Sequence, residues 1–303
     1  MIRISVPTGT LGATLVKGTT GTTRWLLILF LIMPAPIILA AEEVRVAVIG
    51  GLERTGDWER IRTTAERRLN LQISTVLSAP KEQIVPVFMR GEAELLLIHG
   101  GDETFALEAL GLASPSHIWA YNDFVIAGPE DDPAGVAGAE SGSEALRKIQ
   151  TNGQSLISFR DPGSHQILDR LLEQAGLIPA QINLRPDSVN RPQQILRQAA
   201  QDRAYVIVGH IPVAFGRMPS RGIKVLFTGD PSMRSGYVAV TPGPEHPADP
   251  AARHNAERLA QFLISPQGQE LLYDPTAVDG ARWLYPRQEA TGLLSFPEQP
   301  ITP

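Results

Sequence analysis

The chain of 303 residues contains no cysteine. This absence excludes disulfides, thiolate metal ligands and a thiol nucleophile, and we expect no lipoprotein anchor. Basic residues are also scarce: 27 Lys and Arg stand against 32 Asp and Glu, and the formal net charge is -5. Nucleic-acid partners require a basic surface, so this composition argues against them. With 43% hydrophobic residues, the chain can bury the core of one large or two small domains.

The N-terminal segment has the composition of an export signal. Residues 25–41 form an apolar run that follows two basic residues and ends in small residues. The alternative is a retained membrane anchor, but two prolines interrupt the run, and it is short for a span of about 20 residues. We therefore predict that residues 1–41 are a signal peptide, cleaved after Ala40 or Ala41, and that the mature protein is periplasmic.

The spacing of apolar residues predicts alternating strands and helices. Short Val- and Leu-rich runs, typical of buried strands, occur at residues 44–49, 71–77, 95–98, 155–158, 205–208, 225–228 and 237–241. Helical spacing occurs at residues 58–69, 81–90, 143–150, 164–174, 192–201, 251–264 and 266–273. This order implies parallel β-α-β units and an α/β fold.

Four sequence strings are distinctive when taken together. They are YNDFVIAGPEDDPAG (121–135), RGEAELLLIH (90–99), SFRDPGSH (158–165) and FLISPQGQ (262–269), the last followed by Val278-Asp279-Gly280 and Tyr285-Pro286. These strings resemble the crossover segment, a buried strand with terminal His, the second-domain anion loop and the C-terminal helix and tail of periplasmic tungstate-binding proteins. That family comprises the solute receptors of oxyanion ABC importers. The resemblance covers nearly all of the mature chain.

The resemblance implies a type II periplasmic-binding-protein fold. In this fold two α/β lobes, each a mostly parallel sheet flanked by helices, are joined by two crossover strands, and the ligand lies between the lobes. Lobe I is expected to comprise residues 42–128 and 237–303, and lobe II residues 129–236. Ligand closure is then a hinge motion at Gly128-Pro129 and Gly236-Tyr237.

An oxyanion needs several hydrogen-bond donors, which hydroxyls, helix-start N–H groups and an arginine can supply. In lobe II, the resemblance places Ser158, Arg160, Gly163 and Ser164 around the ligand. The alternative is an ordinary capping loop in which Arg160 is solvated. The family's loop is one residue longer, and here Phe159 separates the serine from the arginine.

In lobe I, the family carries threonines and a serine where this chain has Val48 to Gly51. We predict that Gly50 and Gly51 let backbone N–H groups approach the ligand, with Thr55 nearby; the alternative is a tight turn. His210 stands where the family usually carries an arginine, and we include it among the ligand-binding residues. A third loop, residues 187–192, is expected to cap a helix rather than face the ligand.

These features predict a periplasmic substrate-binding protein of an ABC-type importer. We expect it to bind a small, tungstate-like oxyanion as a monomer and to deliver it to an inner-membrane permease. The rival interpretation is a receptor-derived sensory or scaffold protein that acts through a protein partner, with a changed or lost ligand. The chain lacks a Gly-x-Ser-x-Gly elbow, and Ser164 and His165 point in different directions on one helix turn, so we expect no catalysis. The histidines lack metal-ligand spacing, and we expect no metal and no cofactor.

Overall fold

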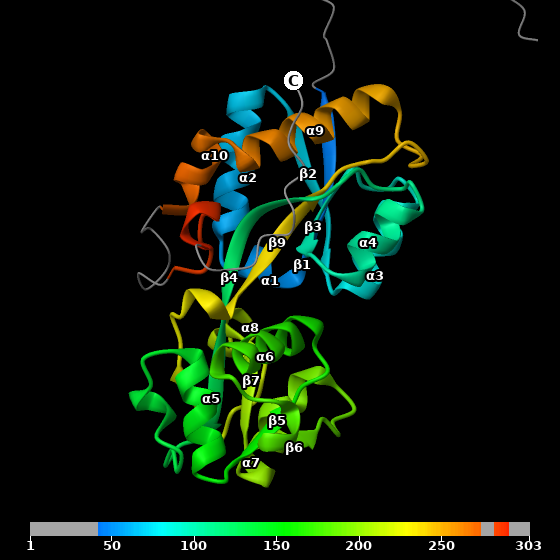
Figure 1. Ribbon diagram of the computed structural model, residues 1–303. Coiled ribbons are helices and arrows are strands. Elements are labelled where there is room, and N and C mark those ends of the chain that lie inside the picture. Colours follow the sequence, from blue (N-terminus) through cyan, green and yellow to red (C-terminus); the bar gives the residue numbers. More distant parts are fainter. Residues whose placement is uncertain (1–41, 274–281, 291–303) are drawn as a thin grey trace, which may run out of the picture. The chain divides into compact units, whose positions relative to one another are not determined.

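A computed structural model describes residues 42–273 and 282–290 (Figure 1). The described residues belong to one compact unit. The predicted signal peptide and the Val278-Asp279-Gly280 motif lie outside the described residues. Within the described ranges, no helix combines the length and the apolar character that crossing a membrane requires.

The strands form one mixed sheet in the order β2-β1-β3-β9-β4-β7-β5-β6, with β8 paired to β4. The strands are β1 (Glu43–Ile49), β2 (Gln72–Ala79), β3 (Leu95–His99), β4 (His117–Pro129), β5 (Ser155–Ser158), β6 (Asn183–Pro186), β7 (Tyr205–Gly209), β8 (Ile223–Phe227) and β9 (Arg234–Val240). Strands β1, β2 and β3, called here the first strand group, are parallel to one another. Strands β5, β6 and β7, the second strand group, are also parallel.

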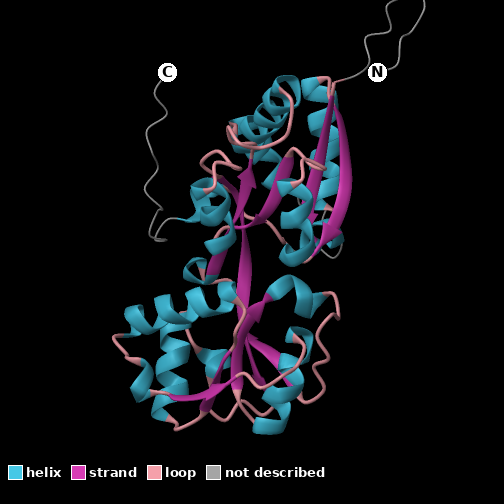
Figure 2. Ribbon diagram, turned by 90° about the vertical axis from the view of Figure 1, so that its right-hand side faces the viewer, coloured by secondary structure: helices cyan, strands magenta, loops and turns pink. Residues whose placement is uncertain are grey.

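Helices lie on both faces of these strands (Figure 2). They are α1 (Gly50–Arg54), α2 (Asp57–Leu69), α3 (Lys81–Met89), α4 (Asp102–Ala109), α5 (Gly142–Thr151), α6 (Pro162–Ala175), α7 (Ile195–Asp202), α8 (His210–Ala214), α9 (Pro250–Ile264) and α10 (Pro266–Glu270). Short 3-10 turns occur at η1 (Val136–Gly138), η2 (Pro179–Gln181), η3 (Pro192–Gln194), η4 (Pro231–Met233), η5 (Leu271–Tyr273) and η7 (Arg287–Ala290).

Apolar side chains are buried on both faces of each strand group. In β3, Leu95 and Leu97 belong to one hydrophobic cluster, whereas Leu96 and Ile98 belong to another on the opposite face. Successive residues of a strand point to opposite faces, so a strand covered on both sides needs a continuous apolar run. The second strand group likewise has two clusters. The predicted α/β fold with buried parallel strands is confirmed.

β4 is the long strand that runs from the first strand group to the second (Figure 1). Its residues 117–123 pair with β9, and Phe124–Ala127 pair with β7. β4 and β9 are therefore the two predicted crossover strands. The exchange of partners falls between Asp123 and Phe124, a few residues before Gly128. A Cβ on Gly128 would lie 2.4 Å from a ring carbon of Tyr205, so close packing requires glycine there.

The elements that the sequence patterns missed are short. Gly50-Gly51 does not simply end β1: it begins α1. Likewise α4, α8 and β6 have eight, five and four residues. The missed helices matter because α1 and α8 both contribute residues to the centre of the molecule.

Candidate functional site

The start of α1 lies against elements from other parts of the chain. A Cβ placed on Gly51 would lie 3.7 Å from Cγ2 of Ile211 in α8 and 3.7 Å from the hydroxyl oxygen of Tyr237 in β9. Thr55 has a local role: its hydroxyl donates to the carbonyl of Leu52 at 2.9 Å and accepts from the N–H of Asp57 at 3.2 Å. A hydroxyl has one proton, so Thr55 holds the turn between α1 and α2.

The segment from the end of β5 to the start of α6 contains four of the predicted ligand residues. Its Asp161 caps α6, accepting from the N–H of Ser164 at 2.9 Å and from its hydroxyl at 3.1 Å. Ser164 is buried, and its one hydroxyl proton is engaged in this cap. Ser158 ends β5 and is partly buried. Gly163 lies against β4, because a Cβ there would be 2.6 Å from Cζ of Phe124.

Arg160 forms a bidentate ion pair with Asp187. Its Nε and Nη2 donate to the two carboxylate oxygens at 2.8 and 2.7 Å, and Nη2 also donates to the carbonyl of Val189. The hydrogen bonds raise the pKa of Arg160 and lower that of Asp187. Half of the arginine side chain is exposed. The remaining nitrogen, Nη1, is the group through which Arg160 can meet a ligand.

His210 begins α8, and its ring packs against an aromatic residue that the sequence patterns did not single out. The ring centroids of His210 and Trp283 are 5.1 Å apart, and Phe215 lies at the same distance from Trp283. Burial lowers the pKa of His210, although Asp123 partly opposes the shift. A neutral imidazole can donate one hydrogen bond, but it does not supply the positive charge of the arginine that the family carries at this place.

His99 lies where the first strand group meets the crossover strands. Its ring stacks on that of Tyr237 with centroids 4.1 Å apart, and its Nδ1 is 3.4 Å from the hydroxyl oxygen of Ser235. Phe124 lies edge-on at 6.4 Å. Burial, reinforced by the charge of Lys81, lowers the pKa of His99 to about 4. The imidazole is therefore neutral near neutral pH.

Asn122 lies on the same face of the sheet as Ser235 and Phe124. It pairs directly with Ser235 across β4 and β9, and Phe124 follows it by two residues. Paired residues and residues two apart share a face. Asn122 is 3% exposed, and its Oδ1 has no hydrogen-bond partner in the described part of the chain. We call Gly51, His99, Asn122, Phe124, Gly163, Ser235 and Tyr237 the junction.

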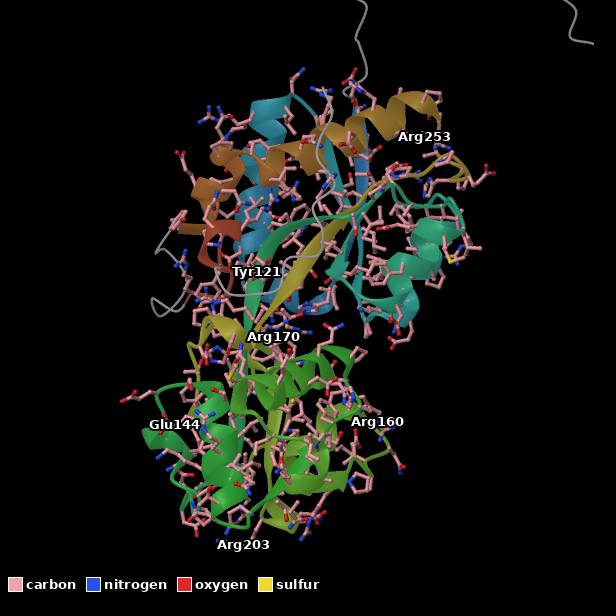
Figure 3. The ribbon with its side chains drawn as sticks, in the orientation of Figure 1. Tyr121, Glu144, Arg160, Arg170, Arg203 and Arg253 are labelled. Atoms are coloured by element: carbon pink, nitrogen blue, oxygen red, sulfur yellow. The ribbon has the colours of Figure 1, made fainter. Side chains whose placement is uncertain are left out.

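The other face of the crossover strands is held by a buried ion pair. Asp123 accepts from Nε of Arg234 at 3.1 Å and from the hydroxyl of Tyr285 at 2.6 Å. The guanidinium of Arg234 lies 3.6 Å from the centroid of the Tyr285 ring. Backbone hydrogen bonds in both directions join Tyr285 to Tyr121, and Arg170 donates to the carbonyl of Arg234 (Figure 3). This network fastens the C-terminal segment to the crossover.

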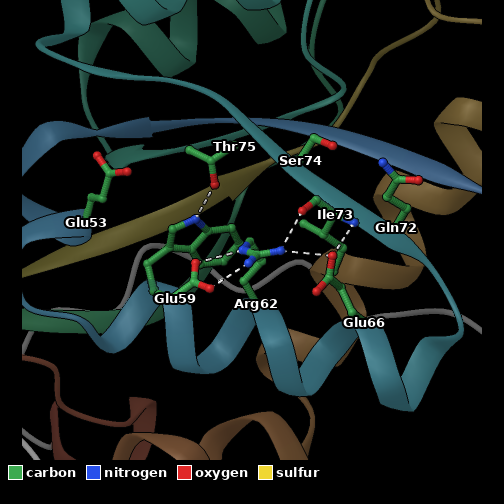
Figure 4. A pocket seen from close by; sticks show the side chains of 9 residues that line it. Glu53, Glu59, Arg62, Glu66, Gln72, Ile73, Ser74 and Thr75 are labelled. Atoms are coloured by element: carbon green, nitrogen blue, oxygen red, sulfur yellow. Dashed lines mark hydrogen bonds and ion pairs between the residues drawn. The ribbon is translucent and has the colours of Figure 1, made fainter.

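Two surface hollows, of about 440 and 500 Å³, lie away from the junction. In the first, between α2 and β2, Arg62 pairs with Glu59 and Glu66, and Nε1 of Trp58 donates to Thr75 at 2.8 Å (Figure 4). The second lies along α9. None of the predicted ligand residues lines either hollow.

Comparison with known proteins finds a sequence relative and several solved structures of similar fold. No family model matches the chain. A Haloferax volcanii protein described as "Putative ABC transporter anion-binding protein" is 25% identical over 255 residues, which cover 82% of this chain and 72% of that protein.

Two solved structures are similar in fold. The tungstate-binding protein TupA of Desulfovibrio alaskensis G20 is 21% identical, with a TM-score of 0.61 over 81% of this chain and 99% of that one. The tungstate ABC transporter structure from Geobacter sulfurreducens is 22% identical, with a TM-score of 0.58 over 77% and 98%. The chain thus has the type II periplasmic-binding-protein fold, and the predicted fold is confirmed. None of these descriptions names an enzyme.

Proposed function

We propose that the protein is the periplasmic receptor of an ABC-type importer, binds a small anion and delivers it to an inner-membrane permease. The observation that carries this proposal is the likeness of fold along nearly the whole of two tungstate-binding structures. The description of the Haloferax volcanii relative points to the same class of ligand. The starts of α1 and α6 both lie at the junction, and the backbone N–H groups of Gly51 and Gly163 are proposed to face the ligand there.

The receptor is proposed to have two lobes, residues 42–128 with 237–303 and residues 129–236. The exchange of strand partners after Asp123 supports a first crossing point slightly earlier in the chain than Gly128. Bending of β4 and β9 at this place would open and close the ligand site between the lobes.

The ligand site is proposed to combine Gly50 and Gly51 with the loop from Ser158 to Gly163. The backbone N–H groups of these segments and Nη1 of Arg160 are the proposed donors. Thr55 and Ser164 contribute by holding their turns, because both hydroxyl protons are already engaged. His210 is proposed to line the site as a neutral donor.

Thermal unfolding of the purified protein with a panel of anions tests the proposal. The panel contains tungstate, molybdate, sulfate, phosphate and several organic acids. A ligand at a hundredfold its Kd adds about 2.7 kcal/mol to the free energy of unfolding, which corresponds to a rise in Tm of about 5–10 °C. A rise with one of these anions is the expected result, and a flat response to all of them contradicts an anion receptor.

One observation favours a second function, that of a receptor-derived sensory or scaffold protein. The chain lacks the family's hydroxyls at Val48 to Gly51, and Thr55 and Ser164 have local partners. A scaffold would keep the fold without the ligand. Anion-independent stability, together with direct binding to a purified periplasmic partner domain, would favour this second function.

A further inference from the structure

The junction contains a buried hydrogen-bond acceptor that the fold leaves unused. Oδ1 of Asn122 has no partner among the described residues, although the side chain is almost completely buried. Leaving a buried polar atom unpaired costs free energy, which a ligand can recover. Ser235 and Phe124 lie on the same face of the strands as Asn122. Ser235 is 3.4 Å from Nδ1 of His99, and Phe124 packs against Gly163 at the start of α6.

We propose that the ligand of this protein is an anion that carries its own hydrogen-bond donor, and that Asn122 Oδ1 accepts this hydrogen bond. The proposal rests on the proposed function and narrows the class of substrate. Two kinds of anion have the required chemistry: oxyanions that keep a proton at neutral pH, such as phosphate, and organic acids with a hydroxyl group.

The surroundings of Asn122 support a mixed donor and acceptor site. Ser235 is within reach of His99, so its hydroxyl is already paired. Burial keeps His99 neutral and raises the pKa of Tyr237, whose phenol stays protonated and able to donate. With the amide in the orientation that the structure has, a fully ionised oxyanion, which offers only acceptors, would direct its lone pairs at those of Asn122 Oδ1.

Such an arrangement discriminates between ligands by more than size. A site built to pair with a group on the substrate rejects an analogue without that group, because the buried partner is then left unpaired. Sulfate, tungstate and molybdate carry no proton at neutral pH, whereas phosphate carries at least one. The acceptor therefore predicts that this protein binds phosphate or a hydroxy acid more tightly than tungstate, the ligand named for the two structures of similar fold.

The experiment measures Kd by calorimetry on the purified protein at neutral pH for two matched pairs of anions. Phosphate and sulfate differ by a proton, and malate and succinate differ by a hydroxyl group. We expect the donor-bearing member of the binding pair to bind at least about tenfold more tightly. Binding within the phosphate and sulfate pair identifies the ligand as a protonated oxyanion, and binding within the malate and succinate pair identifies it as a hydroxy acid.

Two variants of Asn122 then test whether this residue causes the difference between the two Kd values. Asn122→Leu removes the acceptor and should reduce the ratio of the two Kd values to about one. Asn122→Asp keeps the size and adds a negative charge, so it should weaken the donor-free anion more than the donor-bearing one. Ser232→Ala is the matched control: Ser232 Oγ is also buried and has no partner in the described part of the chain, but it belongs to η4, and its removal should leave the ratio unchanged.

The outcomes separate this inference from the proposed function. Tight binding of sulfate, tungstate or succinate in preference to the partner anion overturns the inference and leaves the anion receptor in place. An unchanged ratio in either Asn122 variant, once its thermal unfolding shows that it folds, also overturns it. If no anion of the panel binds, both the inference and the receptor are wrong.

Discussion

The loop at the start of α6 and the junction differ in how their polar groups are used. In the loop, Arg160 pairs with Asp187 and Ser164 with Asp161, so local partners account for its conformation without a ligand. In the junction, polar groups come from three distant segments, and the acceptor of Asn122 has no partner among the described residues. A sequence match finds the first kind of region, whereas unmet hydrogen-bonding capacity marks the second.

Breaking the ion pair behind the junction should have the largest effect on stability. Asp123→Ala removes one partner of a buried ion pair, the carboxylate that accepts from Nε of Arg234 and from the hydroxyl of Tyr285. We expect a loss of about 3–5 kcal/mol in the free energy of unfolding, measured by urea denaturation. Asp123→Asn, which keeps the volume, should lose less. A loss below about 1 kcal/mol in both variants would mean that the crossover is held by strand pairing alone.

The titration of His99 should give the next largest effect. Burial lowers its pKa to about 4 from the ordinary 6.5, so between these values the unfolded chain binds a proton that the folded protein does not. Stability is therefore full above pH 6.5 and falls as the pH drops through 4, by about 3 kcal/mol in total for this residue. Denaturation curves at several pH values measure the slope.

The His99→Gln variant isolates this contribution. His210 and His246 also have lowered pKa values and give slopes of the same sign in parent and variant. The difference between the two slopes belongs to His99. Equal slopes would show that the imidazole reaches solvent and that the junction is not as dry as its stacked rings indicate.

Two physical effects predict opposite signs for a substitution of Gly163. Alanine favours a helix over glycine, which alone would stabilise α6. Packing opposes this, because the new Cβ would lie 2.6 Å from Cζ of Phe124, a buried ring that also meets His99. We expect Gly163→Ala to cost about 1–3 kcal/mol in chemical denaturation.

Gly138→Ala is the control for this substitution, since a Cβ on Gly138 meets nothing within 4 Å. Its effect should stay within about 0.5 kcal/mol. If Gly163→Ala stabilises the protein, then Phe124 moves freely and the start of α6 is not packed onto the crossover.

The sequence was sufficient for the fold but not for the junction. The run Leu95–Ile98 is apolar at every position because both of its faces are covered, and this pattern predicts a buried parallel strand directly. Asn122 has no comparable signal: it lies inside a strand, and its importance depends on Ser235, more than a hundred residues later. Arg160 was predicted from a motif, but its main partner, Asp187, follows a separate strand.

Arg160 provides the mildest test, and it addresses the loop rather than the junction. Arg160 is half exposed, but the side chain of its partner Asp187 is nearly buried and also accepts from the backbone N–H groups of Arg160 and Val189. Arg160→Gln should therefore lower Tm by about 2–4 °C. Nη1 is the proposed ligand donor, and its loss should weaken anion binding about fivefold. Arg203→Gln is the surface control, because Arg203 forms an ion pair with Asp131 at 2.6 Å in which both side chains are exposed. If both variants bind the anion like the parent, Arg160 serves only to fasten the loop, and the junction alone selects the ligand.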